Sequence, residues 1–171
     1  MSSFSNEWTK LYEQKKDFIY HNSQIFQLLK SFRNREIKDV INDCKMVLQY
    51  GQDRIFVLNV LLYLKEDIRE HLIESIIDIA ISGSQAEIGV SFEVLDSMQR
   101  EFIKKNMVVI IEKNITRYIE DDLMEDNFLQ IIALFKYFNM YIERQSFLIK
   151  YCKERDNKVL RQLFDDYYNF D

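Results

Sequence analysis

The near absence of helix-breaking residues is the feature that most constrains the fold of this chain. The sequence has no proline and only three glycines in 171 residues. Tight turns, β-hairpins and strand edges normally draw on these two residues, so an all-β or α/β chain of this length would need many more of them. The sequence therefore predicts an all-α protein built from long helices.

Hydrophobic periodicity supports the same fold class. Apolar residues recur at three- and four-residue spacing along almost the whole chain, as in Ile68, Leu72 and Ile76, which is the pattern of amphipathic helices. Short connections between helices predict antiparallel neighbours. Breaks at polar or glycine-containing stretches place the expected helices at 5–20, 22–33, 35–49, 53–64, 66–81, 85–100, 103–119, 123–139, 141–154 and 156–168.

Two kinds of residue mark expected helix ends. Gly83 follows a periodic segment, where a glycine in the left-handed conformation commonly closes a helix. Side-chain oxygens of Ser and Asp cap helix starts, and a Glu three residues later completes a capping box. The pairs with this spacing are Ser84 with Glu87 and Asp122 with Glu125.

Composition bounds the domain organisation and the partners. With 47% hydrophobic and 30% charged residues, the chain is predicted to form a single domain over residues 1–171. A net charge of -5 argues against a nucleic-acid partner, because binding to a phosphate backbone depends on clustered Lys and Arg.

The N-terminus lacks a signal-peptide pattern and no segment has eighteen uninterrupted apolar residues, so we expect a cytoplasmic protein without membrane contact. Cys44 and Cys152 lie in apolar contexts and are predicted to be buried free thiols.

The second half of the chain is repetitive. When residues 68–80 are aligned with 107–119, the apolar positions fall in register, and the same offset carries over to the following helix. A shorter third unit spans 141–168. A period near 40 residues with two helices per unit is typical of stacked helical repeats. The apolar pairs at the offset of 39 include Leu72 with Ile111 and Leu95 with Leu134.

Two segments carry a resemblance to a known repeat class. Residues 66–69 (Glu-Asp-Ile-Arg) and 156–161 (Asp-Asn-Lys-Val-Leu-Arg) resemble the acidic, aliphatic and arginine pattern of HEAT repeats. This resemblance covers residues 35–168 and implies antiparallel hairpins stacked as a short HEAT- or armadillo-like α-solenoid, with 1–33 as N-terminal capping helices. The first helices lack the proline of HEAT repeats. An irregular helical bundle would give similar patterning and is the alternative fold.

The sequence contains no recognisable reaction centre. The only histidines, His21 and His71, stand outside the spacings of helical metal sites, and no glycine-rich phosphate loop is present. We interpret His21 as a helix-end residue and His71 as a solvated surface residue. The chain is therefore predicted to have no catalytic, metal or cofactor site and not to be an enzyme. A helical enzyme with a carboxylate site is the remaining alternative of that class.

Two surface features are the candidate partner-binding residues. Five acids surround one expected inter-helix loop, and aromatic residues stand beside acids at the C-terminus. A solvated loop and an aromatic cap over the last helices are the purely structural interpretations. The candidate residues are Glu120, Asp121, Asp122, Glu125, Asp126, Tyr167, Tyr168 and Phe170.

Size, charge and repeat pattern together suggest a function. The chain resembles HEAT-like immunity proteins that bacteria make beside secreted or contact-delivered toxins. The resemblance implies a non-catalytic protein that binds a basic toxin domain and occludes it, with the acids steering the encounter and the aromatic residues anchoring the complex. The alternative is a helical-repeat scaffold or adaptor for a host protein or peptide.

Overall fold

The computed structural model describes residues 36–50, 53–153 and 157–168. Within these ranges every regular element is helical and none is a strand, which confirms the all-α fold class. Contacts divide the chain into two compact units, residues 1–43 and 44–171, and the boundary lies inside helix α2 (Ile37–Tyr50). The helices predicted at 5–20 and 22–33 lie outside the described residues. All features discussed below belong to the second unit.

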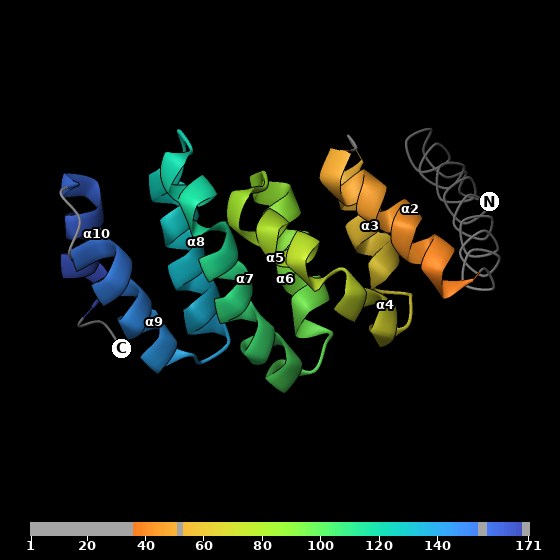
Figure 1. The fold of residues 1–171 in the computed structure, drawn as a ribbon. Helices are drawn as coiled ribbons and strands as arrows, with labels where there is room; N and C mark the ends of the chain where they lie inside the picture. Colours follow the sequence, from red (N-terminus) through yellow and green to blue (C-terminus); the bar gives the residue numbers. More distant parts are fainter. Residues whose placement is uncertain (1–35, 51–52, 154–156, 169–171) are drawn as a thin grey trace, which may run out of the picture. The chain divides into compact units, whose positions relative to one another are not determined.

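The helices of the second unit follow the predicted boundaries closely, apart from the segments described below. After α2, the chain forms short helices before and after one long helix (Figure 1). The elements are α3 (Arg54–Leu61), α4 (Glu66–His71), α5 (Ile73–Ser82), α6 (Gln85–Asp96), α7 (Arg100–Glu120), α8 (Met124–Tyr137), α9 (Tyr141–Leu148), the π-helical turn η1 (Ile149–Lys153) and α10 (Lys158–Tyr167).

Consecutive helices pack as hairpins. Helix α5 packs on α6, α7 packs on α8, and α9 with η1 packs on α10. Each hairpin also contacts the next: α5 touches both α7 and α8, and α8 touches α9 and α10. Helix α3 packs on α6. The apolar faces of these helices therefore close against one another without a sheet, as expected for amphipathic helices.

The core of the second unit runs along these helix contacts. Both members of the aligned pairs Leu72 with Ile111 and Leu95 with Leu134 are buried. Cys44 and Cys152 are both buried, as predicted, and neither forms a disulfide. The residues with no exposed surface include Leu58, Leu61, Ile76, Ile77, Ala80, Val94, Ile103, Met107, Phe128, Ile131 and Leu148.

One predicted helix is broken. The periodicity predicts a continuous helix over 66–81, whereas the structure ends α4 at His71 and begins α5 at Ile73. The cause is Arg69, which is buried and whose Nη1 donates to the carbonyl oxygens of Leu61 (3.0 Å) and Leu64 (2.7 Å). Leu61 is the last residue of α3 and Leu64 lies in the turn after it, and the Leu61 carbonyl also accepts the backbone N–H of Leu64 at 3.2 Å. The prediction was wrong here because a tertiary contact sets the orientation of α4.

The turn between α5 and α6 also differs in part from its prediction. Gly83 has φ -76° and ψ 172°, so the expected left-handed conformation is wrong. Glycine is needed for space, because a Cβ at this position would lie 2.5 Å from the carbonyl oxygen of Ile79. The capping box that begins α6 is confirmed, since a Glu87 carboxylate oxygen accepts the backbone N–H (2.7 Å) and the hydroxyl (2.8 Å) of Ser84.

The start of α8 uses a different acid from the predicted one. Leu123 occupies the N-cap position, so the predicted capping box of Asp122 with Glu125 is wrong. Asp121 orders the turn instead, because its Oδ1 accepts the backbone N–H of Leu123 at 2.9 Å. The loop between α7 and α8 has the predicted length of three residues, but it spans 121–123 where the sequence pattern indicates 120–122.

Candidate protein-binding surfaces

The five predicted acids gather at the loop between α7 and α8. Four of them are exposed and Asp121 is half-buried. Among the described residues, no ion pair involves any of the five. Their charges are therefore left to act on the surroundings, where a cluster of one sign attracts a partner of the opposite sign. We call Glu120, Asp121, Asp122, Glu125 and Asp126 the acidic loop.

The predicted aromatic residues lie at the end of α10. Tyr167 is 36% exposed, and the neighbouring Asp166 accepts a hydrogen bond from Gln162 at 2.8 Å. Tyr168 stacks on Phe164 with 4.6 Å between ring centroids, so part of this aromatic group packs on its own helix. Phe170 lies outside the described residues.

The structure does not bring the acids and the aromatic residues together. Helix α10 begins beside the start of α8, where Asn157 contacts the sulfur of Met124. It ends beside the last turns of α8, where Tyr167 lines a groove with Ala133 and Lys136. At the rise of an α-helix, Met124 and Ala133 are about 14 Å apart. The acidic loop and Tyr167 therefore stand at opposite ends of α8 and form two separate surfaces.

A pocket between α7 and α9 was missed by the sequence prediction. It has a volume of about 200 Å³, and Ile142 at its edge is 80% exposed. The signal in the sequence was Ile142 itself. It is a large aliphatic residue on α9, but it does not lie on the helix face that buries Arg144 and Phe147. We call this the apolar pocket. Its lining is Val108, Ile111, Phe135, Ile142, Phe147 and Tyr151, with Glu112, Glu143, Ser146 and Lys150 as the polar members.

Ion pairs connect the first helices of successive hairpins. Lys113 donates to Glu74 at 2.7 Å across α7 and α5, and Arg117 pairs with Asp78 on the next turn. Lys150 of η1 donates to Glu112 of α7 at 2.7 Å. The hydrogen bond with Glu112 raises the pKa of Lys150, whereas that of Lys113 lowers the pKa of Glu74. All of these side chains are at least partly exposed, so water screens each pair and it adds little to the stability.

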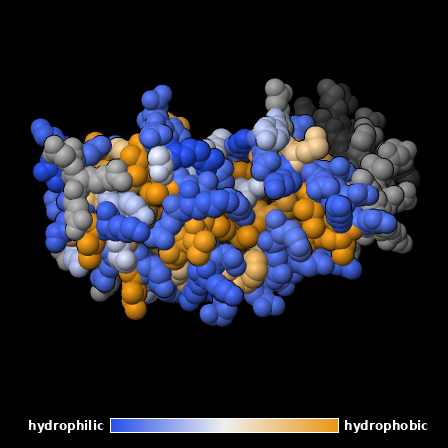
Figure 2. Space-filling model, in the orientation of Figure 1, coloured by the Kyte–Doolittle hydropathy of each residue, from blue (hydrophilic) through white to orange (hydrophobic). Residues whose placement is uncertain are grey.

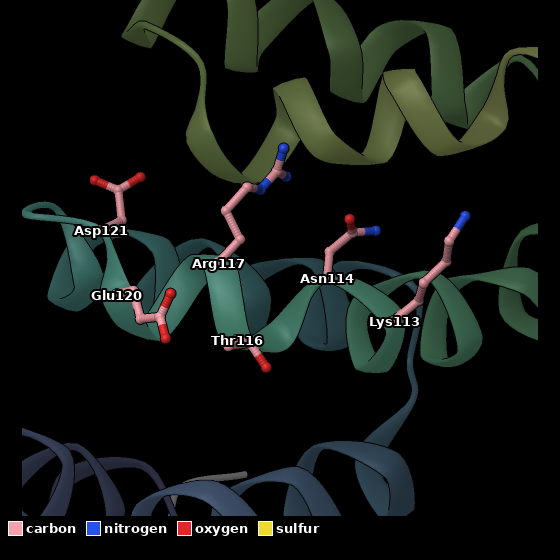
Figure 3. Close-up of a pocket in the computed structure, with 6 residues that line it drawn as sticks. All are labelled: Lys113, Asn114, Thr116, Arg117, Glu120 and Asp121. Atoms are coloured by element: carbon pink, nitrogen blue, oxygen red, sulfur yellow. The ribbon is translucent and has the colours of Figure 1, made fainter.

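The side chains near the C-terminal end of α7 leave the helix on two sides (Figure 3). Lys113, Asn114 and Arg117 point toward the α5–α6 hairpin, whereas Thr116 and Glu120 lie on the other side of the helix. The residues facing α5 are thus mainly basic, and the acidic loop begins where α7 ends. On the face shown in Figure 2, hydrophobic residues are exposed in patches, and hydrophilic residues separate these patches.

Two reactive side chains of the second unit, Cys152 and His71, have contrasting environments. Burial raises the pKa of the Cys152 thiol to about 12, so the nucleophilic thiolate is scarce near neutral pH. His71 is exposed, and its Nδ1 lies 2.7 Å from the carbonyl oxygen of Asp67 on its own helix, in agreement with a surface role. No group of three or more His, Cys, Asp or Glu that could hold a metal ion occurs among the residues described.

No helix in the described part of the chain has both the length and the apolar character required to cross a bilayer. In comparisons with known proteins, the chain matches no family model, no curated protein and no solved structure.

Proposed function

We propose that this chain is a non-catalytic protein-binding protein whose hairpins stack as a short HEAT-like α-solenoid. Support for stacking comes from the sequence separation of the side chains in contact. Glu74 with Lys113 and Asp78 with Arg117 are both 39 residues apart, the offset that aligns the apolar residues of the two hairpins. Equivalent positions of neighbouring units lie side by side when repeats stack by translation.

The proposed partner is a basic toxin domain, and the protein acts as an immunity protein that binds and occludes it. The observation that carries this proposal is the acidic loop, whose exposed carboxylates have no ion-pair partner among the described residues. An uncompensated cluster accelerates encounter with a positively charged surface and disfavours acidic competitors.

The apolar pocket would add a hydrophobic contact to the electrostatic attraction of the acidic loop. Its residue Glu112 lies on the same side of α7 as Thr116 and Glu120, because these positions are four residues apart. Glu112 and Glu120 are about 12 Å apart along the helix. A partner that inserts one apolar side chain into the pocket could therefore also reach the acidic loop with a basic residue. Apolar anchors surrounded by polar contacts hold most of the binding energy of protein interfaces.

The first test is affinity purification of the tagged protein from its own host, followed by mass spectrometry and a salt series. We expect one dominant basic partner that is toxic when expressed alone and harmless beside this protein. Recovery of many weak partners would favour the adaptor function instead. Recovery of no partner, together with enzymatic turnover in a substrate screen, would contradict the proposal.

The second test concerns the role of the acidic loop in that complex. The double variant Glu125→Gln/Asp126→Asn should slow association about tenfold at low salt, because fewer charges steer the encounter. The control Glu93→Gln/Glu101→Gln removes the same charge from exposed positions of α6 and of the opposite end of α7 and should change the rate much less. Stopped-flow kinetics over a range of salt concentrations measures both. Equal effects of the two variants would show that only net charge matters.

A further inference from the structure

A second recess lies on the other side of α7, toward the α5–α6 hairpin. It has a volume of about 620 Å³, within the range of ligand-binding clefts. Its lining comes from the last turns of α2, the start of α3, α4, α5 and the middle of α7. All of these residues lie in the second unit. We call it the polar groove, and its charged members are Lys45, Arg54, Glu74, Asp78, Lys113 and Arg117.

The polar groove carries an excess of positive charge, although the chain as a whole is acidic. Four bases and two acids line it, and both acids already have partners. Glu74 accepts a hydrogen bond from Lys113 at 2.7 Å. Asp78 pairs with Arg117 and also accepts a hydrogen bond from the Tyr118 hydroxyl at 2.9 Å. The bases of the lining that have no ion pair with these two acids are Lys45 and Arg54.

Among the described residues, the contacts of the Arg54 guanidinium are all long. Its Nη1 lies 4.0 Å from Glu87, whose carboxylate already accepts two hydrogen bonds from Ser84. Its Nη2 donates to the carbonyl of Gln49 at 3.5 Å, the outer limit of hydrogen-bond distance. The Nε–H is shielded from solvent and has no acceptor among the described residues. A carboxylate that entered the groove would offer this guanidinium a better partner than it now has.

The remaining lining fits a peptide better than a compact anion. The four bases come from three helices, α2, α3 and α7. Gln49 and Ser75 also line the groove and can bond the N–H and C=O groups of an extended backbone. Tyr50, which is 85% exposed at the same groove, offers an aromatic surface to a neighbouring side chain. These are the contacts of a peptide segment, with charge at some positions and backbone bonding between them.

We infer that the polar groove binds an acidic peptide segment of a partner protein, with Lys45 and Arg54 pairing with its carboxylates. This surface has the opposite sign to the acidic loop, which begins at the C-terminal end of α7. The inference does not depend on the toxin proposal. A partner could engage either surface alone.

The test uses the full chain and a short fluorescent Glu-rich peptide, with the same peptide carrying Gln in place of Glu as its control. Fluorescence anisotropy should detect binding of the Glu peptide only. The variant Lys45→Gln/Arg54→Gln should weaken that binding about tenfold. The matched control Lys104→Gln/Lys105→Gln removes the same charge from the first half of α7, outside the groove, and should bind like the unaltered protein. Circular dichroism should confirm that every variant is folded.

Several outcomes would overturn the inference. Equal binding of the Gln peptide would show that carboxylates are not recognised, and equal weakening by both double variants would show that only net charge matters. If inorganic phosphate binds in a Lys45- and Arg54-dependent manner and the Glu peptide does not, the groove is a small-anion site. The single variant Lys45→Glu, at an exposed position, replaces the double variant if the latter fails to fold. The double variant Glu125→Gln/Asp126→Asn should leave peptide binding unchanged, which separates this test from that of the acidic loop.

Discussion

Tyr118 shows how a single residue couples a hydrogen bond to burial. Its side chain has no exposed surface, its hydroxyl donates to Asp78 at 2.9 Å, and the Arg117 guanidinium lies 5.0 Å from its ring centroid. Burial raises the pKa of Tyr118 to about 12, while the Arg117 charge opposes part of the rise. The residue therefore stays neutral in the folded chain over a range where an exposed tyrosine ionises.

This pKa shift predicts a loss of stability at alkaline pH. Between about pH 10 and 12 the unfolded chain releases the Tyr118 proton and the folded chain keeps it, so the free energy of unfolding falls as pH rises. The variant Tyr118→Phe should be about 1 kcal/mol less stable at neutral pH, where it lacks the hydrogen bond. It should also lose about 2 kcal/mol less than the unaltered protein over the alkaline range. Urea unfolding at a series of pH values measures both effects. An unchanged alkaline slope would contradict the assignment.

Cys152 adds to the same alkaline effect over a wider range. Burial raises the pKa of its thiol to about 12 from an ordinary value near 9, so its contribution to stability is present below pH 9 and falls as pH rises toward 12. The Tyr118→Phe measurement is therefore best repeated with Cys152→Ala. The alkaline loss that remains in the double variant then belongs to other groups.

At the scale of helices, the two described glycines play different roles. Gly83 sits in the turn between α5 and α6, where an added Cβ would lie 2.5 Å from a backbone oxygen. Gly89 lies inside α6, and an added Cβ there would have no neighbour within 4 Å. Their substitution by alanine should therefore change stability in opposite directions.

Gly83→Ala should destabilise the protein by roughly 1–3 kcal/mol, because the turn must shift to relieve the overlap. Gly89→Ala should stabilise it by roughly 0.5–1 kcal/mol, because glycine costs conformational entropy in a helix interior. The two variants are matched controls for each other, since each adds one methyl group. Urea unfolding at neutral pH compares them. A loss of stability in Gly89→Ala would contradict the open space at that position.

The helices were predictable from the sequence where local signals decide them. The apolar period predicted α6 and α8 to within a few residues, and the spacing of Ser84 and Glu87 predicted the start of α6. The break before α5 was not predictable, because it depends on Arg69 reaching carbonyl groups of another helix. The same limit applies to the cap of α8, where two adjacent aspartates compete and only the turn geometry selects Asp121.

The candidate surfaces were predictable only in part, for a similar reason. The acidic loop was predictable because its residues are close together in the sequence. Charged residues around an inter-helix loop are also usually solvated, so their exposure could be expected. The apolar pocket and the polar groove require residues from separate helices, such as Val108 with Ile142 or Lys45 with Lys113. Sequence periodicity assigns a face to each helix but does not determine which faces meet.

On the scale of the whole second unit, the contacts between neighbours suggest how it unfolds. The hairpin of α9, η1 and α10 packs mainly on α8. In a stack of repeats, stability is close to a sum of units and nearest-neighbour interfaces, so an end unit can open while the others stay folded. An irregular bundle with a shared core would open as one cooperative unit.

Cys152 can distinguish these two behaviours, because it has no exposed surface and lies in η1 of the last hairpin. In the variant Cys44→Ala it is the only thiol, and a thiol reagent reacts with it only after local or global opening. If the hairpins stack as a solenoid, the labelling rate should rise with urea along a shallower slope than global unfolding followed by circular dichroism. The reason is that opening one hairpin exposes less surface than unfolding the chain. Equal slopes would instead indicate that α9, η1 and α10 unfold together with the rest of the unit, as in an irregular bundle.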